Sequence, residues 1–154
     1  MKFFSLDGRP NTLRLSGKEA DPNRPASSGH RRARALLFEL YPFDTIYEEV
    51  HLPGAKWDLY VDLLVPSRKL AVEIQGEQHR KFNLFFHGTP AAFREQARRD
   101  VTKRHLLEFN GFRLVAIDDD HPPAGWASLI RGDDDGQPDP VGGPDGAAAR
   151  PPAA

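Results

Sequence analysis

The chain has no cysteine and no long hydrophobic run. Without cysteine there is no disulfide framework, zinc–thiolate site, thiol nucleophile or iron–sulfur cluster. No apolar stretch approaches the ~18 residues that a membrane span needs. The N-terminus also reaches Asp7 and Gly8 too soon for the apolar core of a signal peptide. We therefore expect a cytoplasmic protein with no membrane partner.

Net charge is also nearly absent, at −1 over 154 residues, but the charges are unevenly distributed. The last 37 residues hold eight Asp against Arg131 and Arg150, a balance of −6. The rest of the chain holds 19 basic and 14 acidic residues, a balance of +5. The near-neutral sum therefore does not exclude a nucleic-acid partner.

Composition divides the chain into three parts. Residues 131–154 are acidic and rich in Pro, Gly and Ala, so they bury too little apolar surface to offset their ordering entropy, and we expect a disordered tail. Residues 1–27 are broken by Pro10, Pro22 and Pro25 and are expected to form a loosely ordered arm. Residues 28–130 then form the single folded domain.

Within that domain, periodicity predicts the element order α-β-β-β-α-β. A helix over 30–41 starts at a Ser27 or Ser28 cap and stops at Pro42, and a second helix runs from Thr89-Pro90 to Asn110-Gly111. The predicted strands are 44–52, 57–65, 69–75 and 112–117. This order indicates an α/β (α+β) fold with a mixed central sheet.

The second and third strands predict a hairpin with a specific register. A turn centred between Ser67 and Arg68 pairs residues whose numbers add to 135, so Asp62 faces Glu73 and Tyr60 faces Gln75. Facing carboxylates, with β-carbons about 5 Å apart, repel each other unless something neutralises them. A divalent cation such as Mg²⁺ prefers such oxygen ligands. The alternative is a solvated polar face with a shifted register or a nearby arginine.

The residues around this hairpin resemble a known family. Asp62, ten residues, then Glu73-Ile74-Gln75 is similar to the motif of the PD-(D/E)XK nuclease superfamily. The strings VDLLVPSRKLAVEIQGEQH and RRDVTKRHLLEFNGFRLVAI look like the branch of very-short-patch repair and phage homing-type endonucleases. The resemblance covers residues 29–118 and implies a restriction-endonuclease-like core, with a host-cytoplasm location if the chain is phage-encoded.

The resemblance also implies roles for residues along the hairpin. Asp62, Glu73 and the backbone carbonyl of Ile74 would hold Mg²⁺ (or Mn²⁺), with Glu39 as a candidate extra carboxylate. Gln75 departs from the lysine common at its position; it carries no charge and cannot act as a base, so it would orient the attacking water or bond Tyr60 instead. His79 is the candidate catalytic base or phosphate contact.

Basic residues on the two helices are candidate DNA contacts. They are Arg94, Arg98, Arg99, Lys103 and Arg104 on the second helix, with Arg31, Arg32 and Arg34 extending the surface from the first. Asp100 and Lys103 lie on nearly one helix face and resemble a D-x-x-K-like pattern of the same branch, which makes them candidates to complete the site, with Asp100 as an accessory residue; the alternative is that Asp100 caps an arginine. Glu48 and Glu49 are expected at the surface of their strand, with one of them able to approach the site.

Together these features predict a Mg²⁺-dependent endonuclease that hydrolyses DNA phosphodiester bonds. Two alternatives stay open: a non-catalytic nucleic-acid-binding module with the same fold, which Gln75 favours, and a nuclease acting on RNA. No zinc-finger or helix-turn-helix pattern supplies specificity, so a homodimer or a specificity-providing protein is a further candidate partner.

Overall fold

A four-stranded mixed sheet forms the centre of the fold. The computed structural model describes residues 1–76, 88–118, 120 and 122–132. The strands lie in the order β3-β4-β5-β6; β4 is antiparallel to β3 and β5, whereas β6 is parallel to β5. The elements of this part are α1 (Ser28–Leu40), β3 (Tyr47–Leu52), β4 (Leu59–Val65), the 3₁₀ turn η1 (Pro66–Arg68), β5 (Leu70–Gln75), α3 (Pro90–Phe109) and β6 (Arg113–Asp118). The predicted α/β class is confirmed, and the elements described within 28–76 and 88–118 follow the predicted order.

Both long helices start and stop where the capping residues predict. The Ser27 side chain accepts a hydrogen bond from the His30 amide, and Thr89 Oγ1 accepts one from the Ala92 amide at 3.1 Å. These bonds satisfy N–H groups that the first helical turn leaves without partners. Asn110 ends α3, and Gly111 follows with φ +83°, a conformation that favours glycine.

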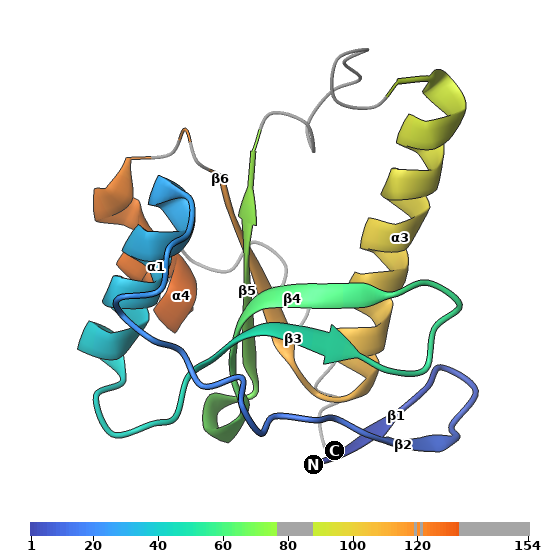
Figure 1. Ribbon diagram of the computed structural model, residues 1–154, viewed down its shortest axis with the longest axis horizontal. Helices are drawn as coiled ribbons and strands as arrows, with labels where there is room; N and C mark the ends of the chain where they lie inside the picture. Colours follow the sequence, from blue (N-terminus) through green and yellow to red (C-terminus); the bar gives the residue numbers. More distant parts are fainter. Residues whose placement is uncertain (77–87, 119, 121, 133–154) are drawn as a thin grey trace, which may run out of the picture. The chain divides into compact units, whose positions relative to one another are not determined.

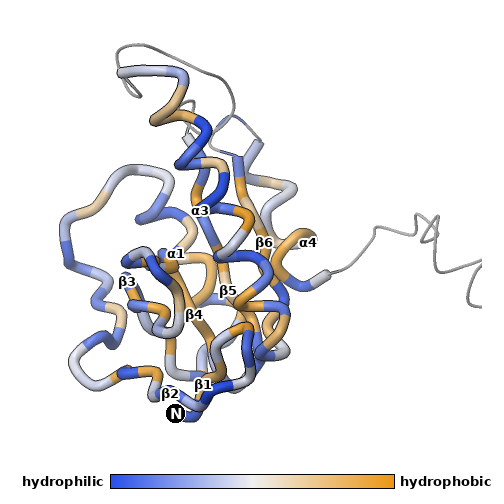
Figure 2. The backbone as a smooth tube through the Cα atoms, turned by 90° about the vertical axis from the view of Figure 1, so that its right-hand side faces the viewer, coloured by the Kyte–Doolittle hydropathy of each residue, from blue (hydrophilic) through white to orange (hydrophobic). Residues whose placement is uncertain are grey.

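The sheet is covered on both sides, with α1 and α3 on opposite faces (Figure 1). The strands carry long apolar stretches, whereas α3 alternates between apolar and strongly hydrophilic positions (Figure 2). Leu106 and Leu107 of α3 are fully buried in the core with Leu64 and Ala71. The C-terminal half of α3 is therefore anchored on the sheet at the hairpin.

The N-terminal segment differs from the loosely ordered arm expected for residues 1–27. Strands β1 (Lys2–Phe4) and β2 (Pro10–Thr12) form an antiparallel hairpin, and Phe3 and Leu13 are buried at 0% and 1% exposure. Their burial in the main core outweighs the chain-breaking effect of Pro10, which lies at the first residue of its strand. The two fully buried apolar residues are widely spaced in the sequence, which is why composition did not reveal this docking.

Asn110 fastens this hairpin to the end of α3. Its side-chain oxygen accepts from the Phe4 amide at 2.7 Å, and its amide nitrogen donates to the Phe4 carbonyl at 2.8 Å. We expect Asn110→Ala to lower the free energy of unfolding by about 1–2 kcal/mol, because two hydrogen bonds are lost at a partly exposed site. Urea unfolding measures the change. An Asn110→Ala protein as stable as the wild type, with unchanged amide exchange in residues 2–12, would contradict this role.

Glu48 is buried, contrary to the expected surface position, and lies in an ionic cluster. It pairs with Arg24, with Arg34 at 3.1 Å and with His30 Nε2 at 3.1 Å, while Glu48 and Arg34 are only 1% and 2% exposed. Burial acts to raise the pKa of Glu48, but the hydrogen bonds to His30 and Arg34 outweigh it and lower the pKa below its ordinary value. The cluster joins β3, α1 and the segment before α1, so Arg34 is not available to contact DNA.

The described residues group into two compact units, one within Met1–His121 and one within Pro122–Ala154. This division differs from the predicted domain limits of 28 and 130. The second unit holds a 3₁₀ turn, η3 (Pro123–Gly125), and a short helix, α4 (Trp126–Arg131). The predicted tail, 131–154, lies outside the described residues beyond Gly132. Across the described ranges, no helix has both the length and the apolar character needed to cross a membrane.

Candidate active site

The candidate site lies where β4 and β5 separate. Their ladder pairs Leu63 with Val72, Leu64 with Ala71 and Val65 with Leu70, which confirms the predicted register in which residue numbers add to 135. No ladder pair is recorded beyond Leu63, although β4 continues beside β3 and β5 continues beside β6 as far as Gln75. The two central strands therefore open into a fork directly at Asp62 and Glu73.

At this fork the two carboxylates replace the missing backbone pairing. Asp62 Oδ2 accepts from the Ile74 amide at 2.8 Å, and Glu73 Oε2 accepts from the Asp62 amide at 3.0 Å. Each acid thus satisfies an amide that the separating strands would leave without a partner. This reciprocal arrangement fixes both carboxylates in position without a ligand.

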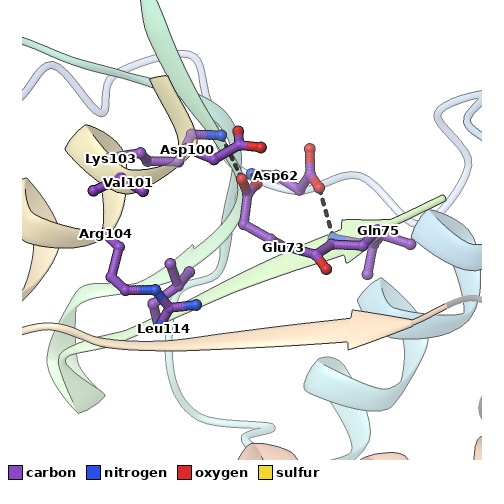
Figure 3. Close-up of a pocket in the computed structure, with 9 residues that line it drawn as sticks. Asp62, Glu73, Gln75, Asp100, Val101, Lys103, Arg104 and Leu114 are labelled. Carbon is purple, nitrogen blue, oxygen red and sulfur yellow. Dashed lines mark hydrogen bonds and ion pairs between the residues drawn. The ribbon is translucent and has the colours of Figure 1, made fainter. Parts of the chain in front are cut away.

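A cavity of about 370 Å³ opens beside the two acids (Figure 3). Lys103, from α3, forms an ion pair with Glu73 Oε1 beside this cavity. The two side chains are only 14% and 15% exposed. The lining comprises Asp62, Glu73, Ile74, Gln75, Asp100, Val101, Lys103, Arg104 and Leu114. The cavity therefore combines the Asp62–Glu73 carboxylate pair and a third acid, Asp100, with two cationic side chains.

The pKa of Glu73 is raised from its ordinary value of 4.5 to about 7. Burial is the main cause and the nearby charge of Asp62 adds to it, while Lys103 acts in the opposite direction. Because the pKa in the folded state is raised, this group favours the fold fully below pH 4.5 and loses that contribution as pH rises through about 7. At neutral pH, burial and the charge of Asp62 thus disfavour the ionised form of Glu73, and a bound cation would favour it.

Seven of the predicted site residues line this cavity: Asp62, Glu73, Ile74, Gln75, Asp100, Lys103 and Arg104. The Ile74 side chain is half-buried. The predicted bond between Gln75 and Tyr60 is absent among the described residues, because the strands have parted and Tyr60 pairs with His51 on β3 instead. His79 lies outside the described residues.

The predicted basic surface is divided by the structure. Lys103 and Arg104 line the cavity, while Arg94, Arg98 and Arg99 lie exposed on the same helix. Arg31 and Arg32 are exposed on α1, on the opposite side of the sheet from α3 (Figure 1). Glu39 is also exposed on α1 and does not line the cavity, so the described structure does not bring it to Asp62 and Glu73.

Carboxylate and carbonyl oxygens at the fork are the ligands available to a metal. Within the described residues, no group of three or more His, Asp or Glu side chains is positioned to hold a metal ion. Magnesium commonly takes only one or two carboxylates and keeps several waters, so Asp62, Glu73 and the Ile74 carbonyl fit such an ion.

The sequence indicated Lys103 as a DNA contact and, together with Asp100, as a candidate to complete the site, but its pairing with Glu73 was not predicted. The spacing of Asp100, Lys103 and Arg104 along one helix was the available signal, since residues three and four apart share a helix face. Val101 and Leu114, which also line the cavity, were not predicted and carry no distinctive pattern.

Two viral proteins resemble part of the chain. Uncharacterized protein 307L of Invertebrate iridescent virus 6 is 39% identical over 64 residues, which cover 42% of this chain and 32% of the viral protein. Uncharacterized protein 033L of Invertebrate iridescent virus 3 is 38% identical over 60 residues, covering 39% and 31% respectively. The chain thus spans about a third of the length of these curated relatives. No family model and no solved structure matches the chain.

Proposed function

We propose that the chain is a metal-dependent endonuclease with a restriction-endonuclease-like core that hydrolyses DNA phosphodiester bonds. One observation carries the proposal: Asp62 and Glu73 are held together by each other's strands at the edge of a cavity that also contains Lys103 and Arg104. Paired acids can hold a metal ion that assists hydrolysis, and the neighbouring cations can bind phosphate oxygens. Together they suit a phosphodiester substrate. The viral relatives are uncharacterized and add no functional information.

In this proposal Mg²⁺ or Mn²⁺ is held by Asp62, Glu73 and the Ile74 carbonyl. A metal bound there would lower the pKa of a coordinated water and neutralise charge on the phosphate. Lys103 and Arg104 bind the phosphate oxygens and stabilise the charge that develops during attack. Gln75 orients the attacking water through its amide, since it cannot take up the proton.

Lys103 brings to the cavity the positive charge that Gln75 does not provide. It reaches the acids from α3 and not from the strand that carries Glu73. A non-catalytic binding module is the second candidate. It is favoured by the uncharged Gln75 and by the finding that, within the described residues, no group of three acids or histidines is positioned to hold a metal ion.

Incubation with supercoiled plasmid distinguishes the two functions. The nuclease should convert it to nicked and then linear DNA with Mg²⁺ or Mn²⁺, and should be inactive in EDTA. DNA binding without cleavage in Mg²⁺, Mn²⁺ and Co²⁺ would instead support the binding module. A parallel reaction tests the remaining alternative by comparing single-stranded RNA with single-stranded DNA of the same length. Preferential cleavage of the RNA would identify a ribonuclease.

Metal affinity is expected to depend on pH because a proton competes with the metal for Glu73. Below its pKa of about 7 the carboxyl is protonated, so Mn²⁺ affinity should fall by up to about tenfold per pH unit and should level off above pH 7. Calorimetric titrations at pH 5.5, 6.5, 7.5 and 8.5 measure this. Affinity that is constant from pH 5.5 to 8.5 would show that Glu73 is not a ligand.

A further inference from the structure

A second hollow adjoins the acidic cavity along α3. It has a volume of about 390 Å³ and is lined by Trp57, Ala97, Arg98, Val101 and Thr102. Val101 lines both spaces and is 53% exposed, so the two are neighbours on the surface of α3. A volume above about 300 Å³ is within the range of ligand pockets.

Trp57 forms the aromatic wall of this hollow and is held there by several contacts. Its indole N–H donates to Glu95 Oε1 on α3 at 3.3 Å, and the Lys56 ammonium lies 4.7 Å from the ring centroid. Lys56 and Trp57 belong to the loop between β3 and β4. The ring is therefore placed against α3 before any ligand arrives.

The N-terminal hairpin supports the same loop. Gly54 has φ +97°, and a β-carbon there would lie 2.8 Å from the Ser5 β-carbon, so only glycine permits this close approach. The turn of the β1–β2 hairpin thus packs directly on the loop that carries Trp57. This contact restricts the loop and helps to preform the aromatic wall.

The charges around the hollow suit a nucleotide better than an apolar peptide. Lys56 lies over the ring, Arg98 lines the hollow, and the exposed Arg94 lies one helical turn before Arg98. Arg94 and Arg98 have no ion-pair partner within the described ranges. An aromatic surface with cations around it binds a base by stacking and its phosphate by charge.

We infer that this hollow is a subsite for an unpaired base of the strand being cut, next to the scissile phosphate. A base inside a duplex has both faces covered by its neighbours, so only an unpaired or displaced base can stack on Trp57. The substrate class is then DNA with a single-stranded or distorted segment beside the cut, which a negatively supercoiled plasmid also offers, and not relaxed, fully paired DNA. This inference rests on the proposed nuclease function, because that function places the phosphate in the adjoining cavity.

Binding to a fluorescent oligo(dT) in EDTA at low salt tests the subsite without requiring cleavage. The full-length wild type should bind the single strand more tightly than a duplex of equal length. Trp57→Ala should weaken single-strand binding by roughly 5- to 100-fold, the usual effect of losing one stacked base. Trp57→Phe should retain most of the affinity because the ring is kept.

Two further variants separate stacking from folding defects. Ala97→Leu fills the hollow from the exposed face of α3 with a good helix former, so it should weaken single-strand binding while the melting temperature is unchanged. Phe43→Ala removes a 99% exposed aromatic elsewhere on the surface and should bind like the wild type.

The inference is overturned if duplex binds as tightly as single strand, or if Trp57→Ala and Ala97→Leu bind oligo(dT) like the wild type. Equal weakening of duplex and single strand in both variants also overturns it, because the hollow would then contact the backbone only. These outcomes are independent of the plasmid assay. A protein that stacks oligo(dT) on Trp57 but never cuts plasmid DNA retains the subsite and loses the nuclease function.

Discussion

Asp62→Asn and Glu73→Gln are each expected to slow plasmid cleavage by at least about a thousandfold, because each removes one of two charged ligands for a metal that contributes several kcal/mol to catalysis. Nicking rates at saturating Mg²⁺ measure the loss. The substitutions are expected to lower the cleavage rate itself, so a higher metal concentration should restore only part of the lost rate.

Both substitutions are chosen to keep the fork intact. The side-chain oxygen of asparagine or glutamine can still accept from the Ile74 or Asp62 amide, so the bonds that hold the strands are preserved. Asp58→Asn is the matched control, since Asp58 is an 87% exposed acid on the nearby loop and should leave cleavage unchanged. If both site variants cut at the wild-type rate, Asp62 and Glu73 do not hold the catalytic metal.

Glu48→Ala is expected to lower the free energy of unfolding by about 3–5 kcal/mol, the usual result of removing one partner of a buried ion pair. Arg34 would remain 2% exposed with its charge uncompensated, although it also donates to the carbonyls of Pro22 and Arg24. Chemical denaturation measures the loss. Glu49→Ala, which changes the exposed neighbouring glutamate, should alter stability by less than about 0.5 kcal/mol.

The same cluster predicts how stability depends on pH. Because the pKa of Glu48 is lowered in the fold, its charged form stabilises the protein above its ordinary value of 4.5, and this contribution is lost as pH falls through the lowered value. The stability difference between the wild type and Glu48→Gln should therefore shrink as the pH falls below 4.5. A difference that grows on acidification would contradict the assignment.

The elements of the central domain could be predicted because local signals fixed their ends. Ser27 and Thr89 begin helices by accepting amide hydrogen bonds, and the alternation of apolar residues fixed the hairpin register. A shift of one residue would have turned Leu63 and Val72 to the wrong face. The facing positions of Asp62 and Glu73 followed directly from that register.

The fork itself could not be predicted from the same pattern. Alternation assumes that pairing continues, whereas here the carboxylates of Asp62 and Glu73 replace the ladder bonds and allow the strands to part. The contact between Lys103 and Glu73 joins residues 30 positions apart and depends on how α3 lies on the sheet. Neither feature has a local sequence signal.

Long-range contacts also explain the other differences. Charged side chains are seldom fully buried, so Glu48 and Arg34 were expected at the surface. Their burial depends on partners that the chain supplies from three separate segments, which neither residue's local pattern reveals. Phe3 and Leu13 likewise dock through contacts with a core whose position only the fold defines.

The most direct test of the account is a Mn²⁺ titration by calorimetry, because it examines the acid pair without requiring knowledge of the DNA target. At pH 7.5 the wild type should bind one Mn²⁺ per chain, in competition with Mg²⁺, and the double variant Asp62→Asn/Glu73→Gln should show no binding at this site. A wild type that binds no Mn²⁺, or a folded double variant that binds it equally well, would contradict the central claim that these two carboxylates form a metal-dependent active site.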